Sequence, residues 1–255
     1  MGKLKEFFNL KGQKNSSYVQ KEKLNFLISK IFGRKVFMGK SLKNFIIIDT
    51  PYGFFYCRKN KNDLHIVSPH YEFEILRVFR KLLKNSRTVF DVGAHIGKYA
   101  IMSAGLNPSA KVYAFEGFPD NTRVLKINKE INNLHNLEII GSALSDKIGK
   151  EKFYISQTGL MTEKSEKSEF VETETIDNFL QKNKIHFIDL IKIDVDGKEQ
   201  NVLEGANRSL SQGKIKNIII EIDINNKKEV IGVLSKNNYS ISEIVPNNYL
   251  ATLNS

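Results

Sequence analysis

The stretch from Thr88 to Gly97 constrains the fold of this chain more than any other. Its sequence, TVFDVGAHIG, is a β-branched and apolar run that ends in an acid and then in two glycines four positions apart. The run predicts a buried parallel strand. The glycines predict a tight turn and then a helix that starts close against the strand. We therefore expect an α/β fold in which Asp91, at the carboxyl end of this strand, lies beside a bound ligand.

His95 and Asp91 narrow the choice of ligand. Sites for nicotinamide or flavin dinucleotides have the pattern G-x-G-x-x-G, whose middle glycine lets the backbone approach a pyrophosphate. Here His95 fills that position, and the Asp91 carboxylate would repel a phosphate. S-adenosylmethionine has no phosphate and carries a sulfonium and an ammonium group, so the turn favours this cofactor. A glycine turn that only serves packing is the alternative.

Acids also follow the later predicted strands. Lys111–Phe115 ends at Glu116, whose carboxylate is placed to accept hydrogen bonds from both ribose hydroxyls. Leu137–Ile140 is a third predicted strand, and the stretch from Ile188 to Glu199 holds a fourth, with acids at its carboxyl end. In an open α/β sheet the carboxyl ends of the strands line the ligand crevice. The side chains after the fourth strand are therefore candidates for substrate chemistry, together with Lys192 within it: Asp194, Asp196 and Glu199.

These motifs together resemble the FkbM family of S-adenosylmethionine-dependent methyltransferases. The resemblance runs in family order from about residue 70 to residue 222, and it rests on seven segments: 90–97, 112–116, 143–146, 175–180, 191–199, 202–206 and 218–221. Three positions differ from the usual pattern: His95 replaces Asn, Gly117 replaces Pro, and Asp196 replaces Glu. The resemblance implies a Rossmann-like seven-stranded methyltransferase sheet with helices on both faces. It also implies methyl transfer to a hydroxyl oxygen, most often of a sugar, a glycan or a related metabolite.

The expected site residues follow from the turn, the strand ends and the resemblance. For cofactor binding they are Asp91, Gly93, Ala94, His95, Gly97, Glu116, Ser142, Ala143 and Asp194. Methyl transfer from a sulfonium is an in-line displacement that also needs a base for the hydroxyl proton. We expect Asp194 to be this base or to orient the acceptor, Lys192 to tune its charge, and Asp196 or Glu199 to position the substrate or the strand end. No paired histidine spacing indicates a metal, although a divalent ion at Asp194 and Asp196 is an alternative.

The positive charge of the chain is concentrated in its first third. Residues 1–84 hold 18 Lys and Arg against 6 Asp and Glu, whereas residues 85–255 hold 21 against 22. We therefore divide the chain into a basic N-terminal extension, 1–84, and a methyltransferase domain, 85–255. The extension has two interpretations. It is a solvated lysine-rich surface, or it meets an anion such as an acidic glycan, a lipid-linked precursor at a membrane, or nucleic acid.

Within the extension, 3–10 and 19–32 have the apolar spacing of helices, which pack on the domain or rest on an anionic membrane face. Short strands are predicted at 44–49, 51–57 and 64–67, and an amphipathic helix at 70–84. Further on, 157–169 is predicted to be a polar loop over the crevice, and 240–253 a hairpin.

Two other function classes stay open. Aromatic and basic residues alternate between Phe54 and Arg58, which could stack on bases, so an RNA ribose methyltransferase is the alternative enzyme. A binding module without turnover is the other. The single cysteine, Cys57, excludes disulfides within the chain and suits a reducing compartment, and no signal sequence is recognisable. We therefore expect a cytoplasmic protein, with oligomeric state undetermined.

Overall fold

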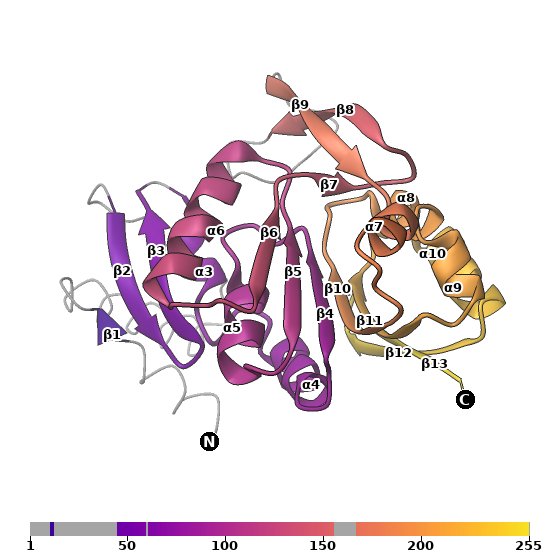
Figure 1. Ribbon diagram of the computed structural model, residues 1–255, viewed down its shortest axis with the longest axis horizontal. Helices are drawn as coiled ribbons and strands as arrows, with labels where there is room; N and C mark the ends of the chain where they lie inside the picture. The colour runs from indigo at the N-terminus through magenta and orange to yellow at the C-terminus, as the bar shows by residue number, and fades with distance from the viewer. Residues whose placement is uncertain (1–10, 13–44, 60, 156–166, 255) are drawn as a thin grey trace.

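A computed structural model describes residues 11–12, 45–59, 61–155 and 167–254. Its centre is a seven-stranded sheet (Figure 1). In spatial order the strands are β12 (Tyr239–Val245), β13 (Asn248–Leu253), β11 (Ile215–Glu221), β10 (Ile188–Ile193), β4 (Thr88–Val92), β5 (Lys111–Phe115) and β6 (Leu137–Ile140). The four pairs from β11 to β6 are parallel, and β13 runs antiparallel to both of its neighbours. The predicted seven-stranded α/β sheet is confirmed.

The central strands are buried along their length, as their apolar sequences predict. Their register decides which side chains meet at the carboxyl edge. Lys192 of β10 lies opposite Asp91 of β4, and Ile193 lies opposite Ile220 of β11. The residues that follow this second pair, Asp194 and Glu221, are therefore neighbours at the end of the sheet.

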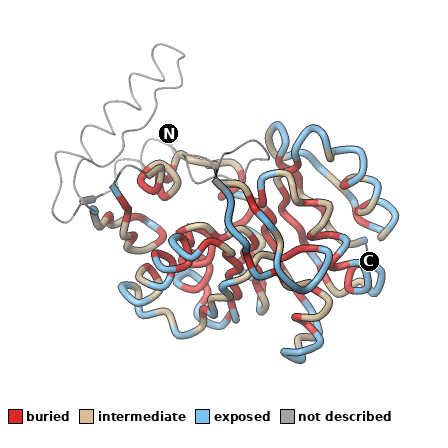
Figure 2. The backbone as a smooth tube through the Cα atoms, turned by 90° about the horizontal axis from the view of Figure 1, so that it is seen from above, coloured by how far each residue is buried: buried red, intermediate tan, exposed pale blue. Residues whose placement is uncertain are grey.

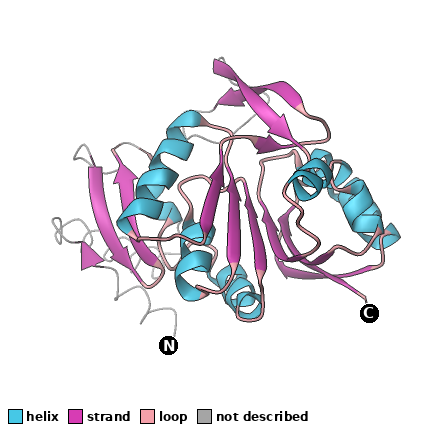
Figure 3. Ribbon diagram, viewed as in Figure 1, coloured by secondary structure: helices cyan, strands magenta, loops and turns pink. Residues whose placement is uncertain are grey.

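Helices cover both faces of the sheet, and each face has its own apolar core (Figures 2 and 3). One face packs against α4 (Phe73–Leu83), α5 (Lys98–Leu106) and α6 (Pro119–Ile131). The other packs against α7 (Ile176–Lys182), α8 (Glu199–Glu204), α9 (Asn207–Ser211) and α10 (Lys227–Lys236). The amphipathic helix predicted at 70–84 is confirmed as α4, which buries four apolar side chains against the sheet: Ile75, Leu76, Phe79 and Leu83.

The described part of the N-terminal extension forms a small antiparallel sheet of β1 (Lys11–Gly12), β2 (Phe45–Thr50) and β3 (Gly53–Arg58). The predicted strands at 44–49 and 51–57 are therefore confirmed. Two backbone N–H groups of β3 donate hydrogen bonds, Phe54 N to Asn132 Oδ1 just after α6, at 2.8 Å, and Tyr56 N to Asn128 Oδ1 within α6, at 2.7 Å. Phe55 shares one apolar core with α5 and α6. The boundary at residue 84 stays a prediction, as do the helices at 3–10 and 19–32, which lie outside the described residues.

The prediction of a strand at 64–67 is wrong, because α3 (Asp63–Ile66) occupies this stretch. The Asp63 carboxylate binds the Arg58 backbone N–H and guanidinium, at 2.8 to 2.9 Å. The Asp63 carbonyl oxygen also accepts a helical hydrogen bond from Val67 N. The four residues 64–67, three of them apolar, are too few to show a period that separates a strand from a helical turn, and the buried ion pair favours the helical turn.

A second small sheet, β7 (Ala143–Leu144), β9 (Lys167–Glu174) and β8 (Gly149–Ile155), projects beyond the large one (Figure 1). The prediction of a loop at 157–169 is wrong for residues 167–169, which pair with β8 in β9. Residues 157–166 lie outside the described part of the chain. Val171 is buried with Phe118 and Phe153, while Phe170 faces solvent. The polar residues of β9 therefore form the solvent-facing side of a β-ribbon. In the sequence, a polar strand of this kind has the same composition as a polar loop.

The predicted hairpin at 240–253 is confirmed as β12 and β13, which are joined by a turn at Asn247 with φ of 67°. Among the helices that the structure describes, none has the length and the apolar character needed to cross a bilayer.

Candidate active site

A cavity lies at the carboxyl edge of the central strands, beside the start of α5. Nine of the predicted site residues line it: Asp91, Gly93, Ala94, His95, Glu116, Ala143, Lys192, Asp194 and Asp196. Gly97 and Ser142, the remaining two, are not among the residues that line this cavity. The order of the strands therefore brings together residues that are about 100 positions apart in the sequence.

Two glycines give the turn after β4 its shape. Gly93 has φ of 77°, and a Cβ atom there would collide with the Asp194 carbonyl oxygen. Gly97 has φ of 92°, and a Cβ atom there would collide with the Leu125 side chain. Gly93 thus allows close approach of the turn to the end of β10. Gly97 allows α5 to pack against α6, which is a structural role consistent with its position away from the cavity wall.

Glu116 holds this turn against the end of β5. Its carboxylate oxygens accept hydrogen bonds from His95 N and Phe118 N, at 2.7 and 2.8 Å. Glu116 is only 5% exposed, and burial raises its pKa to about 7 despite these two donors. Each carboxylate oxygen has a second lone pair, so the predicted contact with ribose hydroxyls remains compatible with this arrangement. His95 Nδ1 is buried and has no hydrogen-bond partner in the part of the chain that the structure describes.

Asp91 lies beneath the turn. Its Oδ2 atom accepts a hydrogen bond from Ala100 N of α5, at 2.9 Å. The side chain is almost completely buried, and burial raises the pKa of Asp91 to about 7, although Lys192 and the Ala100 N–H act in the opposite direction. A buried carboxylate that titrates near neutrality is characteristic of ligand and catalytic sites.

Lys192 and Asp194 form an ion pair, with 2.6 Å between Nζ and Oδ2. The Lys192 ammonium also lies over the Tyr99 ring, 4.7 Å from its centroid. Burial alone would lower the pKa of Lys192, but the attraction of Asp194 and Glu72 outweighs it, so the pKa is raised and Lys192 stays charged. Lys192 is 3% exposed, whereas the Asp194 side chain is 29% exposed. The carboxylate therefore faces the cavity with the ammonium behind it.

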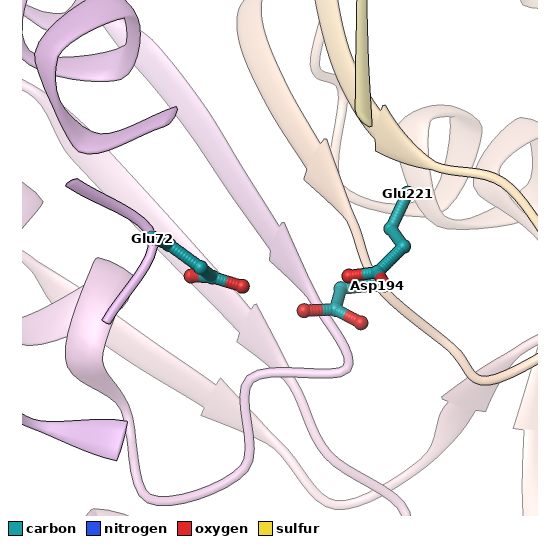
Figure 4. Close-up of side chains that lie close together, drawn as sticks. All are labelled: Glu72, Asp194 and Glu221. Carbon is teal, nitrogen blue, oxygen red and sulfur yellow. The ribbon is translucent and has the colours of Figure 1, made fainter. Parts of the chain in front are cut away.

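Two acids that the sequence did not single out flank Asp194. One oxygen from each of Glu72, Asp194 and Glu221 lies within 4.8 Å of the others (Figure 4). Glu72 precedes α4 in the left-handed region, with φ of 59°, and accepts a hydrogen bond from the Tyr99 hydroxyl at 2.7 Å. Burial, followed by repulsion from Asp194, raises the pKa of Glu221 to about 7. Three carboxylate oxygens at this spacing could hold a hard divalent ion. The Lys192 ammonium already neutralises the charge of one of these carboxylates, Asp194.

Lys98 was also missed. It is 2% exposed, and its Nζ atom donates hydrogen bonds to the carbonyl oxygens of Tyr71 and Ser68, at 2.6 and 3.4 Å. Burial lowers the pKa of Lys98 to about 7. Glu221 had a signal in the sequence, because it ends a strand next to the fourth one. Lys98 and Glu72 had none, since their place in the cavity depends on how α4 and α5 pack.

The turn after β10 has two residues in the left-handed region, Asp196 with φ of 49° and Gly197 with φ of 95°. Glu199 Oε1 accepts a hydrogen bond from Gly197 N at 2.8 Å, and the side chain is buried. Glu199 therefore fixes the turn that carries Asp194 and Asp196, as expected for a residue that positions the strand end.

The segment from Phe54 to Arg58 is only partly available for base stacking. Phe55 and Cys57 are fully buried, and Arg58 is 7% exposed and makes ion pairs with Asp63 and Asp120. Phe54 and Tyr56 are half-buried, and the Tyr56 ring already stacks on Phe45.

The chain is similar to known methyltransferases. A family model described as the methyltransferase FkbM domain matches residues 91–241. The 2-O-methyltransferase NoeI of Sinorhizobium fredii is 25% identical over 162 residues, which cover 54% of this chain and 66% of NoeI. The hexuronic acid methyltransferase AglP of Haloferax volcanii is 26% identical over 168 residues, which cover 65% of this chain and 68% of AglP. The chain thus spans about two thirds of the length of these relatives.

A solved structure of a putative O-methyltransferase from Klebsiella pneumoniae is also similar, with a TM-score of 0.47 and 13% identity. The match covers 72% of this chain and 80% of that one. The family model covers more than half of the chain and includes Asp91, the turn after it and the strand ends around the cavity. The chain therefore belongs to the FkbM family of methyltransferases.

Proposed function

We propose that the protein transfers a methyl group from S-adenosylmethionine to a hydroxyl oxygen of a sugar, either free or within a glycan. Membership of the FkbM family supports the reaction, and the two relatives, a 2-O-methyltransferase and a hexuronic acid methyltransferase, support the acceptor. The observation that carries the proposal is the meeting of acids from the ends of three adjacent strands, Glu116, Asp91 and Asp194, in one cavity.

The residues around the turn after β4 fit S-adenosylmethionine. The cofactor has a sulfonium and an ammonium group, and Asp91 and Asp194 supply carboxylates for cations. Gly93 lets the turn lie against the end of β10, since a Cβ atom there would collide with the Asp194 carbonyl oxygen, and the turn and Asp194 therefore line the same cavity. His95 supplies a buried nitrogen that has no hydrogen-bond partner among the described residues. Phe115 and Phe118, on either side of Glu116, give the same wall an apolar surface that suits a nucleobase.

When bound, S-adenosylmethionine supplies the methyl group, so that its sulfur–carbon bond breaks as the bond to the acceptor oxygen forms. The residues of the chain must orient that oxygen and accept its proton. The Asp194 carboxylate is already paired with the Lys192 ammonium at 2.6 Å, whereas burial, followed by repulsion from Asp194, raises the pKa of Glu221 to about 7 and favours proton uptake there. We therefore assign Asp194 to orienting the acceptor hydroxyl and Glu221 to accepting its proton, with Asp196 at the edge of the acceptor site.

Variants of the two carboxylates test this division. Glu221→Gln should lower kcat by about 10²- to 10⁴-fold, the usual contribution of a general base, and should leave the Kd of S-adenosylmethionine within about twofold. Wild-type kcat should rise with pH through about 7, because only the ionised Glu221 accepts a proton. Asp194→Asn should raise KM for the acceptor and keep this pH dependence. Loss of the pH dependence in Asp194→Asn, with retention in Glu221→Gln, would assign the base to Asp194.

The acceptor class is tested with fractionated host material. The protein is incubated with S-adenosylmethionine that carries a labelled methyl group and with separate glycan, lipid-linked and RNA pools. We expect base-stable label in the glycan pool or in the sugar part of the lipid-linked pool. Label in RNA ribose would replace the proposed acceptor. The cofactor should raise the Tm of the protein and NAD should not, and no shift with either would reject the methyltransferase activity.

A further inference from the structure

We propose that the sugar unit that receives the methyl group carries no acidic group: it is a neutral or an amino sugar, and Glu72 and Glu221 discriminate against a hexuronate. This inference rests on the proposed function and names the substrate class of that same site. It concerns the acceptor ring alone, and other units of a glycan can carry charge.

The described residues that line the cavity are strongly unbalanced in charge. Six of them are acids: Glu72, Asp91, Glu116, Asp194, Asp196 and Glu221. Two of them, Lys98 and Lys192, are lysines. Burial lowers the pKa of His95 to about 4, so this side chain is neutral at physiological pH. Asp91 and Glu116 lie on the proposed cofactor side, which leaves Glu72, Asp194 and Glu221 around the space for the acceptor and Asp196 at its edge.

Neither lysine is available to form an ion pair with a substrate carboxylate. Lys192 is 3% exposed and already contacts Asp194 at 2.6 Å. Lys98 is 2% exposed, and carbonyl oxygens of Tyr71 and Ser68 enclose its ammonium. A hexuronate would therefore bring its negative charge to Glu72 and Glu221, and to Asp194, whose charge Lys192 already neutralises, without meeting an exposed cation among the described cavity residues. Recognition of a carboxylate ordinarily uses an arginine fork or a cluster of N–H donors.

The spacing of the carboxylates determines how strong this repulsion is. One oxygen from each of Glu72, Asp194 and Glu221 lies within 4.8 Å of the others, so a substrate carboxylate placed among them would lie at similarly short range from these acids. Hydroxyl groups of a neutral sugar instead donate hydrogen bonds to carboxylates, and such charge-assisted bonds are the stronger kind. An amino group would add an ion pair.

Glu72 can be replaced without changing any residue at the strand ends, so a Glu72 variant tests the discrimination against a hexuronate directly. It belongs to the N-terminal extension and reaches Asp194 from the opposite side to Glu221 (Figure 4). The Tyr99 hydroxyl, 2.7 Å away, holds it there. Residues 1–84 carry the excess of basic residues of the chain. Their described part nevertheless contributes an acid, Glu72, as its charged side chain in the cavity wall.

The first test identifies the methylated sugar. Glycans are methylated with labelled S-adenosylmethionine, and their uronic acids are then activated with a carbodiimide and reduced with borodeuteride, which marks each former uronic acid with two deuterium atoms. After hydrolysis, mass spectrometry assigns the label to a sugar. We expect the labelled methyl on a neutral or amino sugar without deuterium. Label on a deuterium-marked sugar would overturn the inference and leave the proposed function intact, whereas no label in any sugar would refute both.

The second test measures the role of Glu72 with aryl glycosides that differ only at one position, such as a glucoside, a glucosaminide and a glucuronide. For wild-type protein we expect kcat/KM for the neutral member to exceed that for the uronate by at least about tenfold, as one like-charge contact of this kind implies. Glu72→Gln should reduce this ratio several-fold while the Kd of S-adenosylmethionine stays within about twofold. Glu74→Gln, which removes an acid paired with Arg77 on the same helix, should leave the ratio unchanged. An unchanged ratio in Glu72→Gln, or a wild-type preference for the uronate, would contradict the proposal.

Discussion

Replacement of Asp91 by Asn should stabilise the free protein and weaken its binding of the cofactor. In the free protein, ionised Asp91 is buried, and its pKa is about 7 compared with 3.8 for an ordinary Asp side chain. This difference of roughly three pKa units corresponds to about 4 kcal/mol against ionisation in the folded state. Asn has the same shape, and its carbonyl oxygen can still accept the hydrogen bond from Ala100 N.

The sign of the pH dependence follows from the raised pKa. The folded state binds the proton more tightly than the unfolded state, so the contribution of Asp91 to stability is full below pH 4 and is lost as the pH rises to about 7. Asn does not titrate. The variant and the wild type should therefore have similar free energies of unfolding near pH 4, and at pH 8 the variant should be more stable by about 2 to 4 kcal/mol. For a chain of this size that corresponds to a Tm roughly 5 to 15 °C higher.

Denaturant unfolding across this pH range and calorimetric titration with S-adenosylmethionine measure both effects. At pH 8 we expect Asp91→Asn to raise the Kd by about 10- to 100-fold, which is about 1.4 to 2.7 kcal/mol of lost attraction to a cation. Glu138→Gln is the control, because it removes an exposed carboxylate paired with Lys111 and should change neither quantity. A less stable variant at pH 8 together with an unchanged Kd would refute the reasoning.

Three further substitutions probe the turn and the acceptor wall. Gly93→Ala places a Cβ atom against the Asp194 carbonyl oxygen at a φ of 77°, so it should lower stability by about 1 to 3 kcal/mol, and an unchanged Tm would argue against this close approach. Glu116→Gln removes the charge that two backbone N–H groups share and should weaken cofactor binding about tenfold, so an unaltered Kd in calorimetry would remove Glu116 from the cofactor site. Tyr99→Phe frees Glu72 from its hydrogen bond, so it should raise KM for the acceptor while the Kd of the cofactor stays within twofold. An unchanged KM for the acceptor together with a raised Kd of the cofactor would contradict the role of Tyr99 in holding Glu72.

The sequence predicted the strand-end residues because their neighbourhood follows from a general rule. The carboxyl ends of parallel strands meet at one edge, so Asp91, Glu116 and Asp194 were expected together once their strands were recognised. The same rule could have added Glu221, which ends the strand beside β10. The order of the strands was the one further fact required.

The sequence did not predict residues whose place depends on packing between helices. Glu72 comes to the cavity because the chain turns through a left-handed residue before α4. Lys98 is enclosed because the carbonyl oxygens of the preceding loop converge on it. Local patterns also gave the wrong structure at 64–67, where a buried ion pair between Asp63 and Arg58 favours a helical turn. These contacts join segments whose separation in the sequence has no fixed relation to their distance in space.

The central claim is that this FkbM-family protein moves a methyl group from S-adenosylmethionine to a sugar hydroxyl. The most direct measurement uses S-adenosylmethionine with a ¹³C-labelled methyl group and a glycan acceptor, followed by NMR of the purified product. The account predicts a labelled methyl carbon bonded to a sugar oxygen, formed by wild-type protein and strongly reduced with Glu221→Gln. A labelled methyl on nitrogen, sulfur or carbon, or no labelled product with any sugar, would contradict it.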